Sequence, residues 1–329
     1  MVRLFLSLLV VFYLFSCEET TKKLMVDSTG KSGELVVVID TIHWNDALGN
    51  SVIECLASAQ YGLPQAEPAF TLIRVPNQAF TSIFKTARSI LLFSFDKTLS
   101  EPKITVAYDN WAKNQFVMNI SGKNATEIAN YIKENKVGIL EKFRNEELSK
   151  IAKDYVSEPD DVLKKLIASK FNVSLSVPTG YQVAMDSANF LWLRKEYESG
   201  GHPISQSFFM YEFPMTDSEI TSEMLVAVRD SVTKQWIEGG KENTYMTHEK
   251  LVPPLTLLSK VAEKDCYVTR GLWKLENGFM GGPFVNFAFV NNKESKITVI
   301  DTYVYAPRFD KREYLRQTEA IAATLKFNP

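Results

Sequence analysis

Cysteine and histidine are scarce in this chain of 329 residues, which contains three of each. The histidines lie far apart, in no spacing that holds zinc, such as His-Glu-x-x-His. No two cysteines are separated by two residues, which excludes a thiol redox motif of that kind. The Gly-x-Ser-x-Gly elbow of hydrolases, the Walker phosphate loop and the Rossmann fingerprint are also missing. We therefore expect neither a metal nor a cofactor.

The chain also lacks a large net charge of either sign. The 37 basic and 39 acidic side chains give a formal net charge of −2. Proteins that bind nucleic acid usually carry a strongly basic face, and the basic runs in this chain are short. We expect no nucleic-acid partner.

The N-terminus carries the targeting signal. Residues 1–16 hold one cation, Arg3, followed by an unbroken apolar run that is too short to span a bilayer comfortably. The run ends in LFSC at residues 14–17, which resembles a bacterial lipobox, where cleavage precedes a cysteine that becomes acylated. We interpret residues 1–16 as a lipoprotein signal peptide and Cys17 as the lipidation site. The alternative is an uncleaved anchor helix with an incidental cysteine.

Acylation of Cys17 predicts where the protein is located. Two or three acyl chains bury enough methylene to hold a protein on a membrane durably. Residues 17–33 are polar and without periodicity, which is typical of a flexible tether. The two glutamates after the cysteine resemble the surface-export tag of Bacteroidetes lipoproteins. We expect a cell-envelope protein lipid-anchored to the outer membrane, facing the periplasm or the surface.

The rest of the chain predicts an α+β fold in two domains, residues 34–155 and 156–329. Apolar runs with strand and helix periods alternate, so each domain is expected to pack a mainly antiparallel or mixed sheet with helices. A long helix from residue 125 to about 154 precedes the boundary, and a helix capped by Asp310 closes the chain. Cys55 and Cys266 then fall in different domains, so we expect two buried thiols rather than a disulfide.

An unusual turn lies in the meander predicted over residues 266–307. Gly278, Gly281, Gly282 and Pro283 surround two large apolar side chains, Phe279 and Met280. Hairpin turns are usually short and polar, so we interpret Phe279 and Met280 as candidate binding residues. Either Phe279 is buried as a plug, with Met280 partly exposed, or the turn is an exposed binding tip. We expect the plug.

Two neighbours on the preceding strand complete the candidate binding set. Arg270 and Trp273 lie in the run before the turn. A buried, unpaired guanidinium is very costly, so Arg270 must pair with a carboxylate, for which we expect Glu212 or Glu276, or bind a ligand.

A catalytic alternative rests on Asp40, His43 and Asp46, which follow the first predicted strand. Sites in α/β folds tend to open at the ends of strands, and a base beside a carboxylate could serve a hydrolase. The structural alternative is a strand-end histidine among helix-capping residues. We expect His43 to be packed under Trp44 or the following helix.

Several long motifs resemble one known family. They occur in order along the chain and contain unusual glycines: WLRKE, ISQSFFMYEFPMTD, VAVRDSV, YMTHE, RGLWKLENGFMGGPFV and YVYAP, then DKREYLRQTEAI. The chain is similar, over nearly the whole mature length, to the uncharacterised Bacteroidetes lipoproteins of domain of unknown function 4837. The resemblance implies an envelope lipoprotein and brings no activity with it. The second half also loosely resembles the PsbP-like sandwich, an antiparallel sheet between helices.

These observations favour a lipid-anchored envelope module that binds or organises other components. Its partners would be the membrane, through the acyl chains on Cys17, and an envelope protein or a glycan, through the second domain. An envelope hydrolase that uses Asp40, His43 and Asp46 is the alternative function.

Replacing Cys17 by alanine tests the lipidation site. We expect the Cys17→Ala protein to remain uncut and unacylated, because the sulfur atom is the acyl acceptor. Metabolic labelling with an alkyne fatty acid measures this directly. Label that persists in the variant would remove Cys17 as the site.

Overall fold

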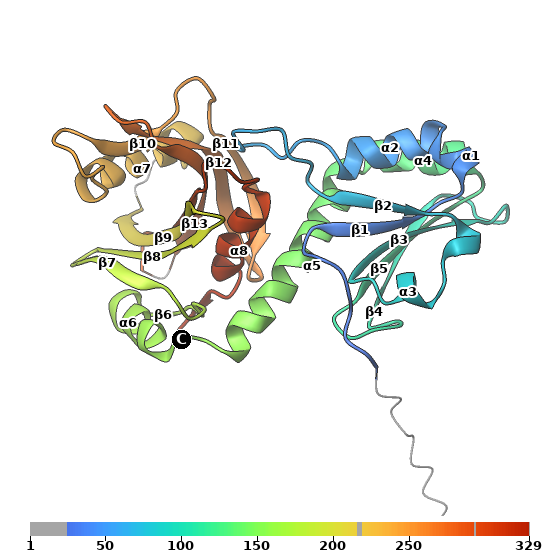
Figure 1. The fold of residues 1–329 in the computed structure, drawn as a ribbon, viewed down its shortest axis with the longest axis horizontal. Helices are drawn as coiled ribbons and strands as arrows, with labels where there is room; N and C mark the ends of the chain where they lie inside the picture. Colours follow the sequence, from blue (N-terminus) through green and yellow to red (C-terminus); the bar gives the residue numbers. More distant parts are fainter. Residues whose placement is uncertain (1–24, 216–218, 293, 329) are drawn as a thin grey trace, which may run out of the picture.

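The computed structural model describes residues 25–215, 219–292 and 294–328. Within them the chain is an α+β protein built on two large sheets, with a small two-stranded sheet beside them (Figure 1), and the α+β class is the one that the sequence patterns predict. Residues 1–16 and the predicted lipidation site Cys17 lie outside the described residues. Over the described residues, no helix is both long and apolar enough to cross a bilayer.

The first domain holds a five-stranded mixed sheet in the order β2-β1-β3-β5-β4. Only β4 is antiparallel to its neighbour. The interior strand β1 is apolar on both faces, as is usual for a parallel strand covered on both sides. The strands are β1 (Glu34–Val38), β2 (Thr71–Val75), β3 (Ser89–Phe95), β4 (Lys103–Tyr108) and β5 (Phe116–Gly122), and the short helices are α1 (Thr41–Trp44), α2 (Ala47–Leu56), the 3-10 helix η1 (Asn77–Ala79) and α3 (Ser82–Lys85).

The residues before β1 are attached to this domain. Ser28 N donates to the carbonyl of Lys113, and Thr29 N donates to the carbonyl of Thr86. We expected a tether as far as residue 33. Because these contacts use the backbone, the side-chain pattern did not indicate them.

Two helices occupy the stretch where one long helix was expected. Helix α4 (Ala125–Glu134) is capped by Asn124, whose side chain accepts from Glu127 N, and α5 (Lys136–Ser157) follows at once. The break is at Asn135, whose side-chain amide donates to the carbonyl of Tyr131. The same carbonyl also accepts from Asn135 N, and the backbone of Asn135 is non-helical, with φ −107° and ψ 17°. The single-helix prediction is therefore wrong.

The second domain is an eight-stranded antiparallel sheet in the order β10-β12-β13-β14-β9-β8-β7, with β11 also paired to β12. Helix α7 packs on one face, and α6 and α8 pack on the other. This explains the unbroken apolar runs of β13 and β14. The strands are β7 (Gln182–Ser187), β8 (Phe190–Ser199), β9 (His202–Pro214), β10 (Tyr245–His248), β11 (Leu255–Val261), β12 (Lys264–Glu276), β13 (Gly281–Asn291) and β14 (Lys296–Tyr305); the helices are α6 (Asp161–Phe171), α7 (Ser222–Trp236) and α8 (Arg312–Ala322); β6 (Val173–Ser174) and β15 (Lys326–Phe327) pair with each other.

The N-terminus of α8 is capped by the first domain. Lys311 N and Arg312 N donate to the two carboxylate oxygens of Glu67, at 2.7 and 2.9 Å. The sequence predicted Asp310 as the cap, which is wrong: Glu67, remote in sequence and buried, supplies the carboxylate. An anion at this end of a helix is stabilised by the free N–H groups and by the helix dipole.

A buried carboxylate on α8 joins three elements. Glu319 accepts two hydrogen bonds from the guanidinium of Arg270 on β12, at 2.9 and 2.6 Å. The same carboxylate accepts from Arg144 on α5, at 3.2 Å. We expected Glu212 or Glu276 as the partner of Arg270, which is wrong, because the closing helix packs on this face of the sheet and brings its own carboxylate.

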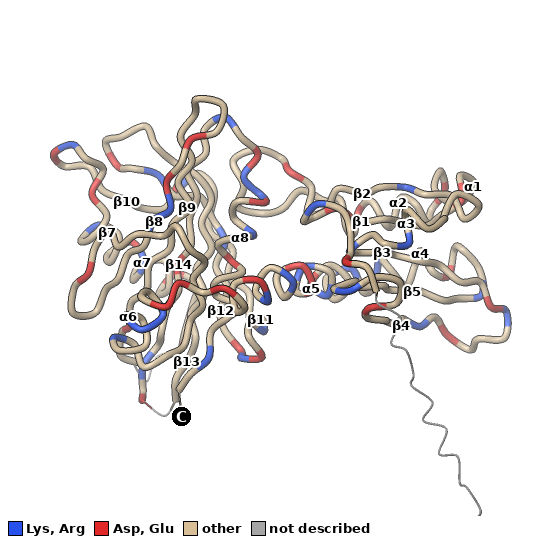
Figure 2. Tube along the Cα trace, turned by 60° about the horizontal axis from the view of Figure 1, so that its bottom comes forward, with Lys and Arg blue, Asp and Glu red and all other residues tan. Residues whose placement is uncertain are grey.

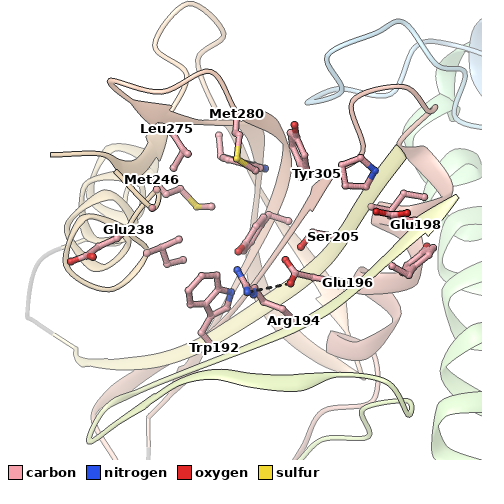
Figure 3. Close-up of a pocket in the computed structure, with 18 residues that line it drawn as sticks. Trp192, Arg194, Glu196, Glu198, Ser205, Glu238, Met246, Leu275, Met280 and Tyr305 are labelled. Carbon is pink, nitrogen blue, oxygen red and sulfur yellow. Dashed lines mark hydrogen bonds and ion pairs between the residues drawn. The ribbon is translucent and has the colours of Figure 1, made fainter. Parts of the chain in front are cut away.

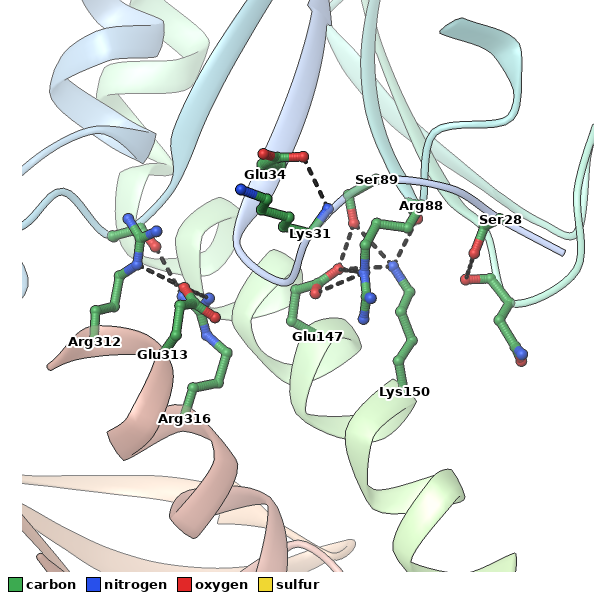
Figure 4. A network of polar contacts seen from close by, with 12 residues as sticks. Ser28, Lys31, Glu34, Arg88, Ser89, Glu147, Lys150, Arg312, Glu313 and Arg316 are labelled. Carbon is green, nitrogen blue, oxygen red and sulfur yellow. Dashed lines mark hydrogen bonds and ion pairs between the residues drawn. The ribbon is translucent and has the colours of Figure 1, made fainter. Parts of the chain in front are cut away.

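A second charged cluster holds α5 to the first sheet. Glu147 is fully buried and contacts Ser89 at 2.7 Å, Lys150 at 2.9 Å and Arg88 at 3.1 Å (Figure 4). Burial raises the pKa of Glu147, but Lys150 and Arg88 outweigh that effect and hold the pKa below its ordinary value. Figure 2 shows residues of both signs along α5, which spans from one sheet to the other.

Replacing Glu319 by glutamine tests the joint between the domains. The variant leaves the largely buried guanidinium of Arg270 without its anion, and Arg144 with Glu141 alone. We therefore expect the free energy of unfolding at pH 7 to fall by about 3 kcal/mol. Urea denaturation measures this loss. Glu158→Gln, at an exposed position after α5, is the matched control and should leave the midpoint unchanged.

The difference in unfolding free energy between the parent protein and Glu319→Gln should depend on pH. Burial raises the pKa of Glu319, but Arg270 and Arg144 outweigh it, so the pKa lies below the ordinary value of 4.5. The stabilisation is therefore fully present above about pH 5 and is lost as the pH falls through the lowered pKa. We expect the difference between the parent and Glu319→Gln to shrink in that acidic range. A difference that grows on acidification would contradict this account.

Candidate ligand-binding site

A cavity of about 670 Å³ opens on the face of the second sheet that carries α7 (Figure 3). Alternate residues of β8 point into it, as the two-residue period of a strand requires. The α7–β10 loop and the β12–β13 turn form its rim. The lining residues are Trp192, Arg194, Glu196, Tyr197, Glu198, Pro203, Ile204, Ser205, Ile237, Glu238, Gly239, Gly240, Met246, Trp273, Leu275, Met280, Tyr303 and Tyr305.

Aromatic rings form the floor of this pocket. The ring of Trp273 lies 5.3 Å from that of Tyr303, centroid to centroid, and 6.4 Å from that of Tyr305. The indole nitrogen of Trp273 donates to the carbonyl of Val304 at 3.2 Å, which fixes the ring against β14. Burial raises the pKa of Tyr303, so this hydroxyl stays neutral. The floor is therefore rigid, apolar and uncharged.

Trp192 contributes an unsatisfied polar group. Its side chain is largely buried, with 9% of the residue surface exposed. The indole N–H makes no hydrogen bond of good geometry among the described residues. Its contact with the Tyr303 hydroxyl, which opposes the rise in the pKa of that phenol, falls short of that geometry. A buried donor without a partner loses its water without compensation, so this N–H favours an acceptor supplied by a ligand.

Acidic side chains outnumber basic ones in the lining of the pocket. Glu196, Glu198 and Glu238 are the acidic lining residues, and Arg194 is the basic one. The guanidinium carbon of Arg194 lies 4.9 Å from the centroid of the Trp192 ring. One of its nitrogens pairs with Glu196 at 3.2 Å (Figure 3). The guanidinium of Arg194 thus covers one face of the Trp192 ring.

The cavity is held in shape by two contacts of α7. Arg229 is buried, donates to Asp301 on β14 at 2.8 Å, and lies 3.7 Å from the centroid of the Phe284 ring. Asp230 accepts from both the backbone and the ring of His248 on β10, at 2.9 and 2.6 Å. Arg229 is buried in the middle of a helix because its partners, Asp301 and Phe284, come from strands far along the chain.

The structure brings together two of the four predicted binding residues. Trp273 and Met280 both line the cavity, because β12 and β13 pair directly across the turn. Arg270 is not in it, since its guanidinium belongs to the buried cluster with Glu319. Phe279 is 87% exposed, so the prediction that it is a buried plug is wrong, whereas Met280 is partly exposed as expected. Successive residues of this turn point in opposite directions, Met280 toward the sheet and Phe279 away from it.

The residues of the catalytic alternative do not form a site. Asp40 accepts from the backbone and the side chain of Asn77, at 2.9 and 2.8 Å, and these hydrogen bonds lower its pKa. His43 is joined to both residues only through the backbone: its N–H donates to the carbonyl of Asp40, and its carbonyl accepts from Asp46 N. Among the described residues, no hydrogen bond joins its ring to either carboxylate. The ring of His43 is half-buried, 5.0 Å from that of Phe95, rather than under Trp44. The geometry supports a structural role, with Asp40 fastening the start of η1.

The cysteines and the possible metal ligands add no further site. Cys55 and Cys266 are buried free thiols, and burial raises the pKa of Cys55 to about 11. Within residues 25–328, apart from the two gaps, no three side chains of His, Cys, Asp or Glu gather closely enough to hold a metal ion.

Several solved structures are similar to about half of this chain. The Ran-binding protein Mog1p of Saccharomyces cerevisiae matches with 11% identity and a TM-score of 0.31, over 47% of this chain and 90% of its own. LpqN of Mycobacterium tuberculosis, described as involved in cell envelope biogenesis, matches with 11% identity and a TM-score of 0.29, over 48% and 83%. A protein of Bacteroides thetaiotaomicron matches with 9% identity and a TM-score of 0.26, over 48% and 46%. Scores this low carry no functional argument.

Family comparisons separate the two halves of the chain. No curated protein matches it. A family model described as Domain of unknown function (DUF8532) matches residues 28–156, so the expectation of one family over nearly the whole mature chain needs correction. A second model, Domain of unknown function (DUF4837), matches residues 160–324, about half of the sequence and nearly all of the domain that holds the cavity. The chain belongs to this DUF4837 family.

Proposed function

We propose that this protein is a lipid-anchored module of the cell envelope whose second domain binds a ligand in the aromatic pocket. The observation that carries the binding role is the buried, unpartnered N–H of Trp192 at the wall of a cavity of about 670 Å³. A concave, mainly apolar site with a few inward polar groups is the usual form of a ligand pocket.

Anchoring and location rest on the sequence. The apolar run of residues 1–16 and the LFSC tetrapeptide support acylation of Cys17 and hence attachment to the outer membrane. The ligand would then be a component of the envelope, an envelope protein or a glycan.

The exposed tip beside the pocket supports a macromolecular ligand. Phe279 leaves 87% of its surface exposed, next to Met280 at the pocket rim. Exposed apolar surface that is continuous with a pocket marks an interaction site, and Phe279 extends the apolar lining at Met280. The ligand would thus extend from the pocket over the β12–β13 turn.

Blocking the pocket tests the proposal. With a photo-crosslinking amino acid in place of Met280, irradiation of the native cells should yield a defined adduct of the lipoprotein. Ser205→Trp places an indole in the cavity, so we expect it to reduce the adduct at least about tenfold, as loss of the buried contacts of a hot spot would do. The readout is adduct intensity on a gel, followed by mass spectrometry.

A matched control separates blocking from misfolding. Ser169→Trp adds the same indole on α6, at an exposed position that does not line the pocket, and should leave the adduct unchanged. Thermal midpoints of both variants should equal that of the parent. An adduct that Ser205→Trp does not weaken would refute binding in this pocket.

The role of Phe279 can be measured beside that of Trp273. Phe279→Ala removes an exposed ring, so we expect an unchanged melting temperature together with a weaker adduct. Trp273→Ala removes a buried ring, 3% exposed, and should lower the free energy of unfolding by about 3–5 kcal/mol. Phe279→Ala with an undiminished adduct would remove the turn from the binding surface.

A further inference from the structure

We propose that the group bound in the aromatic pocket is an organic cation: an ammonium or guanidinium on an aliphatic stem. This inference rests on the proposed binding function and names the chemistry of the ligand. It follows from the composition of the walls, from the cation that the chain itself places there, and from the unpartnered donor.

The walls combine the two kinds of group that attract such a cation. Aromatic faces attract a cation through the ring quadrupole, most strongly the indole of tryptophan. Two indoles and three phenols line this cavity, and the carboxylates of Glu196, Glu198 and Glu238 outnumber the one guanidinium of Arg194. A bound anion would add to this excess of negative charge, whereas a bound cation reduces it.

Arg194 shows how a cation is held at this site. Its guanidinium lies over the Trp192 ring at 4.9 Å and pairs with Glu196 at 3.2 Å, so it occupies an aromatic face and a carboxylate together. Its side chain remains 39% exposed, which lets the long stem turn out toward solvent. We infer that an incoming cation replaces this guanidinium on Trp192, or shares the carboxylate with it.

The Trp192 N–H adds a second requirement. A cation cannot accept a hydrogen bond from it, so the ligand needs a neutral acceptor such as an amide carbonyl close to the charged stem. A lysine or arginine residue of a peptide offers both groups, and so does a small cationic amide. The shared chemistry is a cationic stem beside a carbonyl.

Titration of the full-length lipoprotein in detergent micelles tests this inference. The probes are the N-acetyl methylamides of lysine, arginine, norleucine and glutamate, together with choline and its neutral isostere 3,3-dimethylbutan-1-ol. Binding is read by saturation-transfer NMR and by fluorescence, since two of the five tryptophans line the pocket. We expect the lysine amide to bind at least about fivefold more tightly than the norleucine amide, and choline to bind at least about fivefold more tightly than 3,3-dimethylbutan-1-ol. One cation–π contact of about 1 kcal/mol supplies this ratio. The glutamate probe should bind most weakly.

Variants of the internal cation give the sharpest distinction. Arg194→Gln removes the competing guanidinium and should strengthen cation binding about threefold or more, while Arg194→Lys, which keeps a competing cation, should change it less. Glu196→Gln should weaken binding by a similar factor. Thermal midpoints of the three variants, all at partly exposed positions, check that each is folded.

The sources of the cation separate in the same experiment. Tighter binding of the lysine or arginine amide than of choline assigns the site to a basic residue of a polypeptide. The reverse order assigns it to a free small cation. Either order supports an organic cation.

Other outcomes overturn the inference. Preference for the glutamate probe, with its binding abolished in Arg194→Gln, would mean that Arg194 holds an anion. Equal binding of charged and neutral probes, or no binding of any cation, would also refute it. In those cases the adduct experiment decides about the proposed function separately. If Ser205→Trp removes the adduct in cells, binding in the pocket still stands. If the adduct persists, the proposed function fails together with the inference.

Discussion

The carboxylate of Glu319 is the contact on which the arrangement of the chain depends. It lies, 3% exposed, between Arg270 of β12 and Arg144 of α5, and so joins the large sheet, the closing helix and the helix of the first domain. A buried carboxylate with one guanidinium missing would be costly, because little water remains to solvate the charges. Glu319 therefore needs the guanidinium groups of Arg270 and Arg144 in place, and this pairing fixes α8 between the two domains.

Helix α8 is in effect shared by both halves. Glu67 caps its N-terminus, and Arg316 donates to the carbonyl of Ala69 at 2.9 Å, both from the segment that leads into β2. The same segment reaches further, since the Tyr61 hydroxyl donates to the carbonyl of Pro253 before β11. The first domain thus supports the loops of the second, which explains why two sheets without a common strand form one connected structure.

The pocket follows from the strand period combined with unequal strand lengths. On β8, Trp192, Arg194 and Glu196 share one face because their side chains alternate, and they continue beyond the area that α7 covers. The same period on β14 places Tyr303 and Tyr305 beneath them. An apolar face left uncovered at the end of a helix becomes a cavity lined with rings, and Arg194 fills part of it from within.

The sequence by itself determined what depends on neighbours along the chain. Strand and helix periods gave the α+β class, the start of a helix at residue 125 and the turn around Met280, because these follow from local backbone preferences and alternation. The tertiary structure decided what depends on residues distant in sequence. Glu67 rather than Asp310 caps α8, and Glu319 pairs with Arg270, because a charge takes whichever partner packing brings within about 3 Å, and one-dimensional spacing does not contain that distance.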